Sequence, residues 1–95
     1  MASILRTQLP TAVREIRFQF SPSSKPMIEF IKTAYPPIKA ANPTLPFLIR
    51  PATHTPSRAF IRFERGLETR VDLDTLESVQ SIEDSLSSLI KAATS

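Results

Sequence analysis

Few residues of this chain have the chemistry that catalysis or metal binding requires. The sequence holds no cysteine and a single histidine, His54. Without cysteine there can be no thiolate nucleophile, no disulfide, no zinc–thiolate centre and no thiolate ligand for an iron–sulfur cluster. A lone histidine among threonines lacks the further groups that a working site needs. We therefore interpret His54 as a solvated loop residue.

The hydroxyl groups offer no better nucleophile. Ser21, Ser23 and Ser24 form a cluster before Lys25, but no general base stands beside them and the chain has no Gly-x-Ser-x-Gly elbow. We interpret these serines as residues that cap a helix, with phosphorylation as the alternative. Gly66 is the only glycine, which excludes a glycine-rich phosphate loop. The chain is therefore predicted to be no enzyme, to bind no cofactor or metal, and to have no direct small-molecule substrate.

Length and composition are those of an ordinary globular protein. The chain has 95 residues, of which 41% are hydrophobic and 22% charged, enough for one core. No apolar run approaches the roughly 20 residues that a helix needs to cross a bilayer, so we expect no transmembrane segment. Charge is unevenly distributed, because residues 1–62 hold nine Lys or Arg against two Glu, whereas residues 63–95 hold three against seven Asp or Glu. A charged partner on one side of the molecule is compatible with this division.

The arginines make RNA a class of partner to weigh. They include Arg14, Arg17, Arg50, Arg58, Arg62, Arg65 and Arg70. RNA-binding surfaces usually add aromatic rings that stack on bases, and Phe60 is the single aromatic residue placed for this role. Glu15, Glu64 and Asp72 lie among the arginines and would repel phosphate. The mixed charge favours a protein partner, and we expect no nucleic acid.

The elements that position these residues follow from hydrophobic periodicity. Alternating apolar and polar residues predict three β-strands, and a nearly continuous apolar run predicts a further, buried strand. The strands are expected over residues 13–20, 45–51, 58–64 and 68–73. Apolar residues at helical spacing predict helices over residues 27–38 and 79–90. Pro36 and Pro37 should kink or restart the first helix, because neither has an N–H to donate.

The element order β-α-β-β-β-α predicts an α/β fold with a mixed four-stranded sheet. A right-handed crossover pairs the first strand parallel with the second, and the third strand is expected antiparallel to the first. Gly66 suits a positive φ in the hairpin between the last two strands. Both helices should cover the same face of the sheet, as in a thioredoxin-like core without its second helix. Residues 1–12 are expected to form a flexible, uncleaved N-terminal tail and residues 13–95 the domain.

Strand alternation also predicts which side chains are free for a partner. If the apolar residues of the strands face the helices, then Arg17, Phe60, Arg62 and Arg70 point away from them. Arginine and aromatic residues are frequent interface hot spots. We therefore predict that Arg17, Phe60, Arg62 and Arg70 bind a partner protein.

Three segments resemble a known family. They are VREIRFQF, AANPTLPFLIRP and IRFERGLET, and the most specific part is the run from Asn42 to Arg50. Together they resemble the thioredoxin-like domain that small accessory subunits of mitochondrial respiratory complex I share with mitochondrial ribosomal proteins. The matching positions are Asn42, Pro43, Leu45, Pro46, Leu48, Ile49, Arg50, Gly66, Glu68 and Thr69.

The resemblance implies a non-catalytic accessory subunit of complex I, the NADH dehydrogenase of the respiratory chain. Such a subunit would lie on the matrix side of the mitochondrial inner membrane, in the peripheral arm. It would bind a core iron–sulfur subunit and other complex I subunits, and would support assembly or stability without a share in electron transfer. The alternative is a mitochondrial ribosomal protein of the same fold that binds rRNA or ribosomal proteins.

This chain differs from the family at two cysteine positions, and the fold analogy adds one prediction about a proline. Family members can carry a cysteine after the first strand and another after the second, and the aligned positions here are Ser21 and Pro51. No thiol–disulfide role can therefore transfer to this chain. Thioredoxin-like folds commonly place a cis proline just before the third core strand, and this analogy predicts a cis bond at Thr55–Pro56.

Overall fold

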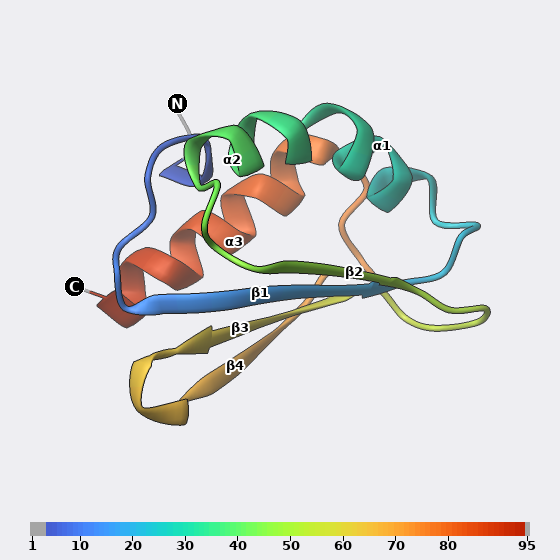
Figure 1. Ribbon diagram of the computed structural model, residues 1–95. Helices are drawn as coiled ribbons and strands as arrows, with labels where there is room; N and C mark the ends of the chain where they lie inside the picture. Colours follow the sequence, from blue (N-terminus) through green and yellow to red (C-terminus); the bar gives the residue numbers. More distant parts are fainter. Residues whose placement is uncertain (1–3, 95) are drawn as a thin grey trace.

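A four-stranded mixed sheet in the order β2-β1-β3-β4 forms one layer of the protein (Figure 1). The computed structural model describes residues 4–94. The central strand β1 (Val13–Phe20) pairs parallel with β2 (Phe47–Pro51) and antiparallel with β3 (Arg58–Phe63). The last strand, β4 (Glu68–Asp72), pairs antiparallel with β3 and forms the opposite edge. The mixed sheet and both pairings of the first strand are confirmed.

The alternation of β1 explains its central position. Ile16, Phe18 and Phe20 are buried on one face of the strand, while the residues between them are partly exposed on the other. β2 begins later than predicted because Leu45 belongs to the preceding turn, where its N–H donates to the Asn42 carbonyl oxygen at 3.2 Å. The register of the sheet is therefore set by the buried side chains of β1.

The first predicted helix is divided into α1 (Lys25–Thr33) and α2 (Tyr35–Ala41), which meet at Ala34. Pro36 and Pro37 fall in the first turn of α2, where a missing N–H leaves no hydrogen bond unmade. Ile38 remains buried and in phase with the apolar side of α1. The expected restart of the helix is thus confirmed, and it occurs just before the prolines.

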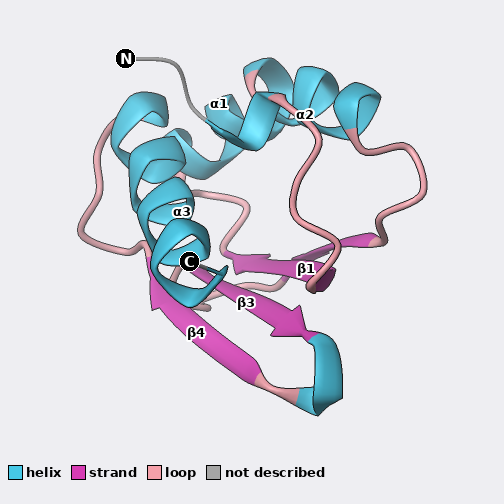
Figure 2. Ribbon diagram, turned by 90° about the vertical axis from the view of Figure 1, so that its left-hand side faces the viewer, coloured by secondary structure: helices cyan, strands magenta, loops and turns pink. Residues whose placement is uncertain are grey.

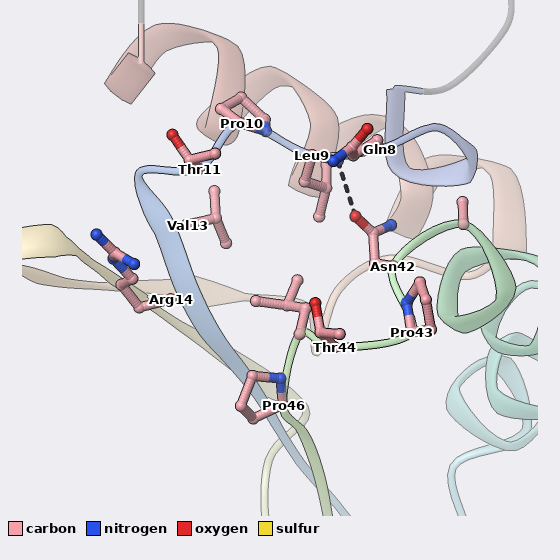
Figure 3. A pocket seen from close by; sticks show the side chains of 12 residues that line it. Gln8, Leu9, Pro10, Thr11, Val13, Arg14, Asn42, Pro43, Thr44 and Pro46 are labelled. Carbon is pink, nitrogen blue, oxygen red and sulfur yellow. Dashed lines mark hydrogen bonds between the residues drawn. The ribbon is translucent and has the colours of Figure 1, made fainter.

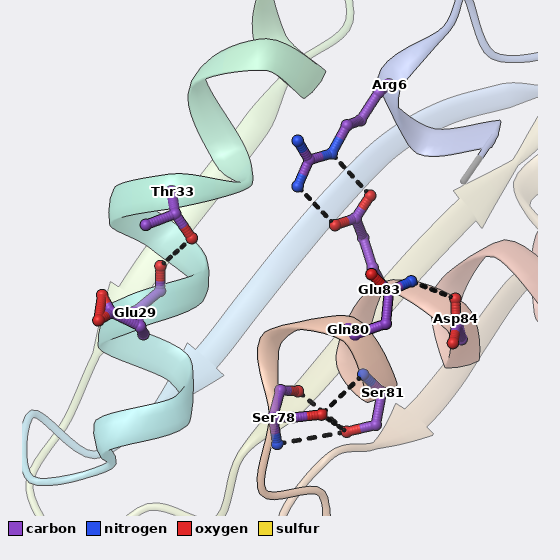
Figure 4. Close-up of polar contacts among 8 residues, drawn as sticks. All are labelled: Arg6, Glu29, Thr33, Ser78, Gln80, Ser81, Glu83 and Asp84. Carbon is purple, nitrogen blue, oxygen red and sulfur yellow. Dashed lines mark hydrogen bonds and ion pairs between the residues drawn. The ribbon is translucent and has the colours of Figure 1, made fainter. Parts of the chain in front are cut away.

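The last helix, α3 (Val79–Thr94), begins with a reciprocal pair of serines (Figure 4). The Ser81 N–H donates to Ser78 Oγ at 3.1 Å, and the Ser78 N–H donates to Ser81 Oγ at 3.3 Å. On sequence grounds either Ser78 or a capping box of Ser81 and Asp84 can start this helix. The structure selects Ser78, because its hydroxyl satisfies a backbone donor that has no carbonyl within the helix.

All three α-helices lie on one side of the sheet, as Figures 1 and 2 show from two directions. The buried core lies between these layers and consists of aliphatic and phenylalanine side chains. Its largest members are Phe18, Phe30, Leu5, Ile16, Met27, Ile38, Ile61, Leu73, Ile82, Leu86 and Ile90. The other face of the sheet carries no helix in the described part of the chain, which confirms the predicted single-sided architecture.

The N-terminal segment contributes to this core, which the sequence did not predict. The short 3-10 helix η1 (Ile4–Arg6) lies against α2 and α3, and Leu5 and Leu9 are only 1% and 6% exposed. Sequence reasoning separated residues 1–12 as a flexible tail, whereas the structure joins residues 4–12 to the domain. Residues 1–3 lie outside the described residues. Two leucines four positions apart give too short a pattern to indicate an element from sequence.

Two backbone positions between the strands were specific expectations. Gly66 has φ = 76° in the turn η2 (Glu64–Gly66) between β3 and β4, as predicted, and Arg65 beside it also has a positive φ of 65°. The predicted cis bond at Thr55–Pro56 is wrong, because no peptide bond between residues 4 and 94 is cis. The loop reverses instead through His54, whose φ is 61°. None of the helices within residues 4–94 is both long and apolar enough to span a membrane.

Candidate functional site

The uncovered face of the sheet brings three of the four predicted partner-binding residues into one row. In the pairing register Arg17 stands opposite Phe60, and Phe60 stands opposite Arg70. The Arg17 guanidinium carbon lies 5.5 Å from the centroid of the Phe60 ring, a cation–π contact. Arg62 lies in the neighbouring row, opposite Glu15 on β1. The prediction that these side chains share a face is therefore met, while their binding of a partner stays a prediction.

Carboxylates on the same face pair with the arginines. Arg17 Nη2 donates to Glu68 Oε1 at 2.7 Å, and Arg17 Nε lies 3.7 Å from Glu15 Oε2. Arg62 Nη2 lies 3.6 Å from Glu15 Oε1. This mutual pairing lowers the positive potential that phosphate would require.

At the β4 edge of this face, arginines are again paired with a carboxylate. Arg70 Nε lies 3.3 Å from Asp72 Oδ1, and Arg58 Nε lies 4.0 Å from the same oxygen. These pairs are exposed to solvent, so each contributes little to folding stability. Together they place arginine and carboxylate groups alternately on this face, a pattern that would complement a protein surface of mixed charge.

Sequence reasoning missed the role of Asn42, which fastens the N-terminal segment to the end of α2 (Figure 3). Its Oδ1 accepts the Leu9 N–H at 2.8 Å, and its Nδ2 donates to the carbonyl oxygens of Thr7 and Ile38, both at 3.0 Å. The side chain is buried, so both ends of the amide need these partners. An asparagine just before a proline at a helix end is the only sequence signal of this arrangement.

A second fastening joins the same segment to α3 (Figure 4). Arg6 Nε and Nη2 donate to the two carboxylate oxygens of Glu83 at 2.9 and 2.8 Å. The Glu83 side chain is 2% exposed, whereas that of Arg6 is 45% exposed. The hydrogen bond to Glu83 raises the pKa of the Arg6 guanidinium, so the pair keeps its positive member throughout the neutral range.

A groove of about 340 Å³ opens between residues 8–14 and 41–46 (Figure 3). Its walls are mostly proline, threonine and aliphatic side chains, and Arg14 is the only charged residue that lines it. Arg14 turns towards Glu64, with 3.9 Å between Nη2 and Oε2. The lining contains no group that could act as a nucleophile with a base beside it. The groove is therefore a surface feature without catalytic chemistry.

The serine cluster and the two positions aligned with family cysteines lie at the carboxyl ends of β1 and β2. Phe20 stands opposite Pro51 in the parallel register, so Ser21 and Pro51 fall at neighbouring strand ends. Ser24 occupies the N-cap of α1, but its side chain makes no capping hydrogen bond. Ser23 instead donates its N–H to Ser21 Oγ at 3.3 Å. Of the predicted capping role only the position of Ser24 is confirmed.

Comparison with known proteins connects this geometry to a family. The profile of the mitochondrial ribosomal protein L51 / S25 / CI-B8 domain matches residues 27–78. The chain belongs to this family. The L51 / S25 / CI-B8 match runs from α1 to Ser78, the residue that caps α3, and it includes both Asn42 and the Gly66 turn.

Three relatives are similar to this chain over most of its length. The NADH-ubiquinone oxidoreductase 10.5 kDa subunit of Neurospora crassa is 39% identical over 82 residues, which are 83% of this chain and 86% of the relative. NADH dehydrogenase [ubiquinone] 1 alpha subcomplex subunit 2 of Arabidopsis thaliana is 32% identical over 90 residues, 92% of each chain. The protein of the same name from Mus musculus is 36% identical over 69 residues, 70% of each chain.

Proposed function

We propose that this chain is an accessory subunit of mitochondrial complex I, the NADH:ubiquinone oxidoreductase of the respiratory chain. The observation that supports it is similarity along nearly the whole length of relatives that are named as subunits of this enzyme. The match to one such relative extends over 92% of this chain and 92% of the relative. The similarity therefore concerns the whole domain and not one short motif.

The subunit is proposed to be non-catalytic. Its sequence contains no cysteine for electron-transfer clusters or thiol exchange, and its one histidine lies in an exposed loop. No group of three or more His, Asp or Glu residues gathers to hold a metal ion within the part of the chain that the structure describes. The contribution of the subunit is to dock on a larger protein and to support assembly or stability of the complex.

The proposed docking surface is the uncovered face of the sheet with Arg17, Phe60, Arg62 and Arg70. We propose that it binds the core iron–sulfur subunit of the peripheral arm, on the matrix side of the inner membrane. Phe60 and Arg17 form a cation–π contact, and aromatic and arginine side chains are common at interface centres. The alternating charges around this pair fit a protein surface that is itself of mixed charge.

A mitochondrial ribosomal protein is the alternative, because the family name covers ribosomal members. Glu15, Glu68 and Asp72 disfavour an rRNA contact on this face, since each pairs with an arginine that phosphate would otherwise use. A native gel of detergent-solubilised mitochondrial membranes separates the two functions. Co-migration of the tagged chain with NADH dehydrogenase activity is the expected result, and co-sedimentation with ribosomes would overturn the proposal.

The docking face is tested separately by charge reversal. Arg17→Glu combined with Arg62→Glu should release the subunit from the complex. Both new carboxylates would stand beside Glu15, so the partner would meet a cluster of negative charge where it now meets paired charges. The matched control reverses two exposed lysines on the helical side, Lys32→Glu and Lys91→Glu, with the same change of net charge. Thermal unfolding of both purified double variants verifies the fold. If the first variant unfolds normally and still assembles, this face is not the docking surface.

A further inference from the structure

The two edges of the sheet differ in what their backbones can bind. On β2 the inward groups are fixed by Ile16 N–H donating to Pro46 O at 3.1 Å and by Ala52 N–H donating to Phe20 O at 2.9 Å. By alternation, the backbone groups of Phe47, Ile49 and Pro51 then point away from β1, towards the outer side of the edge. Pro51 has no N–H, so this edge offers only the two outward donors of Phe47 and Ile49.

The β4 edge is uninterrupted. Leu73 N–H donates to Ser57 O at 2.8 Å, and Phe63 N–H donates to Leu67 O at 2.7 Å. The backbone N–H and C=O groups of the odd-numbered residues of β4 therefore point towards β3. The N–H and C=O groups of Glu68, Arg70 and Asp72 consequently point away from the sheet. β4 contains no proline and no glycine and is the last strand of the sheet. Its exposed edge is visible along the outer side of the hairpin in Figure 1.

An apolar anchor lies at the start of the same edge. Of the large apolar side chains whose burial the structure describes, Leu67 alone is exposed, at 66%. It borders a hollow of about 430 Å³ that also touches Phe63, Thr69 and Ala93 near the end of α3. The positive φ values at Arg65 and Gly66 fold the turn that presents Leu67 at the tip of the hairpin. An exposed leucine beside a hollow and a free strand edge is a combination suited to peptide binding.

We infer that β4 is a docking edge that accepts one extended strand of a partner protein, which lengthens the sheet. Glu68, Arg70 and Asp72 present the charge order negative, positive, negative along the uncovered face. The added strand therefore carries the complementary order, basic, acidic, basic, at alternate positions. The residues between them face the helical side, and an apolar one near Leu67 enters the hollow beside Ala93. This inference rests on the proposed function, since it specifies how the subunit holds its partner.

A second copy of this chain fits the edge less well. Two β4 strands that overlap completely in antiparallel orientation are centred on Arg70. Arg70 would then oppose its own copy, and Glu68 would oppose Asp72 of the other chain. Like charges directly opposite each other destabilise a strand pair. The charge order thus favours a different protein as the occupant.

The test uses the direction of one N–H group. Arg70→Pro removes a donor that points outward, whereas every hydrogen bond between β3 and β4 keeps its partners. Arg70→Ala is the matched control, because it removes the same side chain and keeps the N–H. Each variant replaces the native chain in cells, and its recovery with NADH dehydrogenase activity is measured on a native gel. Recovery of the proline variant should fall at least about tenfold below that of the alanine variant.

The outcomes are distinguishable. If the unaltered chain fails to co-migrate with the enzyme, the proposed function fails. If the unaltered chain co-migrates and the two variants are recovered to the same extent, the edge inference fails and the proposed function stands. Ultracentrifugation of the purified chain is a further arm, because a dimer that Arg70→Pro abolishes would overturn the inference in favour of a second copy.

Hydrogen exchange of the unaltered chain decides the question even if Arg70→Pro impairs folding. In the free protein the outward amides of Glu68, Arg70 and Asp72 should exchange rapidly, while those of Thr69 and Val71 are protected by β3. In the complex all five should be slow, with the outward amides slowed at least about tenfold. Unchanged exchange of the outward amides on assembly would refute an added strand.

Discussion

Replacing Asn42 by alanine tests whether one amide holds the N-terminal segment on the domain. The substitution removes the acceptor for the Leu9 N–H and the donor for the carbonyl oxygens of Thr7 and Ile38. Each hydrogen bond contributes about 1 kcal/mol net, and a buried donor left without a partner costs about 1–3 kcal/mol. We expect Asn42→Ala to lower the free energy of unfolding by about 2–4 kcal/mol.

Thermal unfolding by circular dichroism measures this loss directly. For a domain of this size about 1 kcal/mol corresponds to about 4–8 °C in Tm, so Asn42→Ala should lower Tm by roughly 10–25 °C. Asn42→Asp keeps the acceptor but turns an oxygen towards two carbonyl groups, so it should be at least as damaging. Thr44→Ala, at an exposed position nearby, is the control and should leave Tm nearly unchanged. A shift below about 2 °C for Asn42→Ala would refute the reasoning.

Three further predictions concern the cap of α3, the hairpin turn and the absence of thiols. Ser78→Ala should cost about 1 kcal/mol of stability by leaving the Ser81 N–H without its 3.1 Å acceptor, and Ser88→Ala in mid-helix should be nearly neutral in the same melting experiment. Gly66→Ala should cost about 1–2 kcal/mol through backbone strain alone, because an added Cβ meets no atom within 4 Å while φ stays at 76°; an unchanged Tm would contradict this. In an insulin-reduction assay the purified chain should not exceed the rate of the buffer, since it holds no sulfur nucleophile, and any acceleration would count against a non-catalytic role.

Local patterns were sufficient to predict most of the fold from sequence. The alternation that buries Ile16 and Phe18 is a property of eight consecutive residues, and it correctly oriented β1 and its neighbours. The restart of the first helix followed from the conformational limits of Pro36 and Pro37. Such features depend on a residue and its immediate neighbours, which the sequence displays directly.

Features that depend on distant partners could not be predicted in the same way. Leu9 and Asn42 are 33 positions apart, and neither residue type indicates that the backbone of one binds the amide of the other. The face of Arg17 was predicted, but its 2.7 Å bond to Glu68 depends on the register of three strands. The cis proline failed for a different reason, because it was transferred from a fold and not argued from the loop itself.

The ion pair between Arg6 and Glu83 has a consequence for the order in which the protein is completed. The two residues are 77 positions apart, so η1 cannot gain this partner until almost the entire chain is available. Loop closure over such a distance comes late in folding, after the nearby elements have formed. A chain truncated before α3 would therefore lose the Arg6–Glu83 pair together with its last helix, and Asn42 would be left to hold the N-terminal segment. Arg6 in the first turn and Glu83 in the last helix can therefore pair only after α3 has been synthesised.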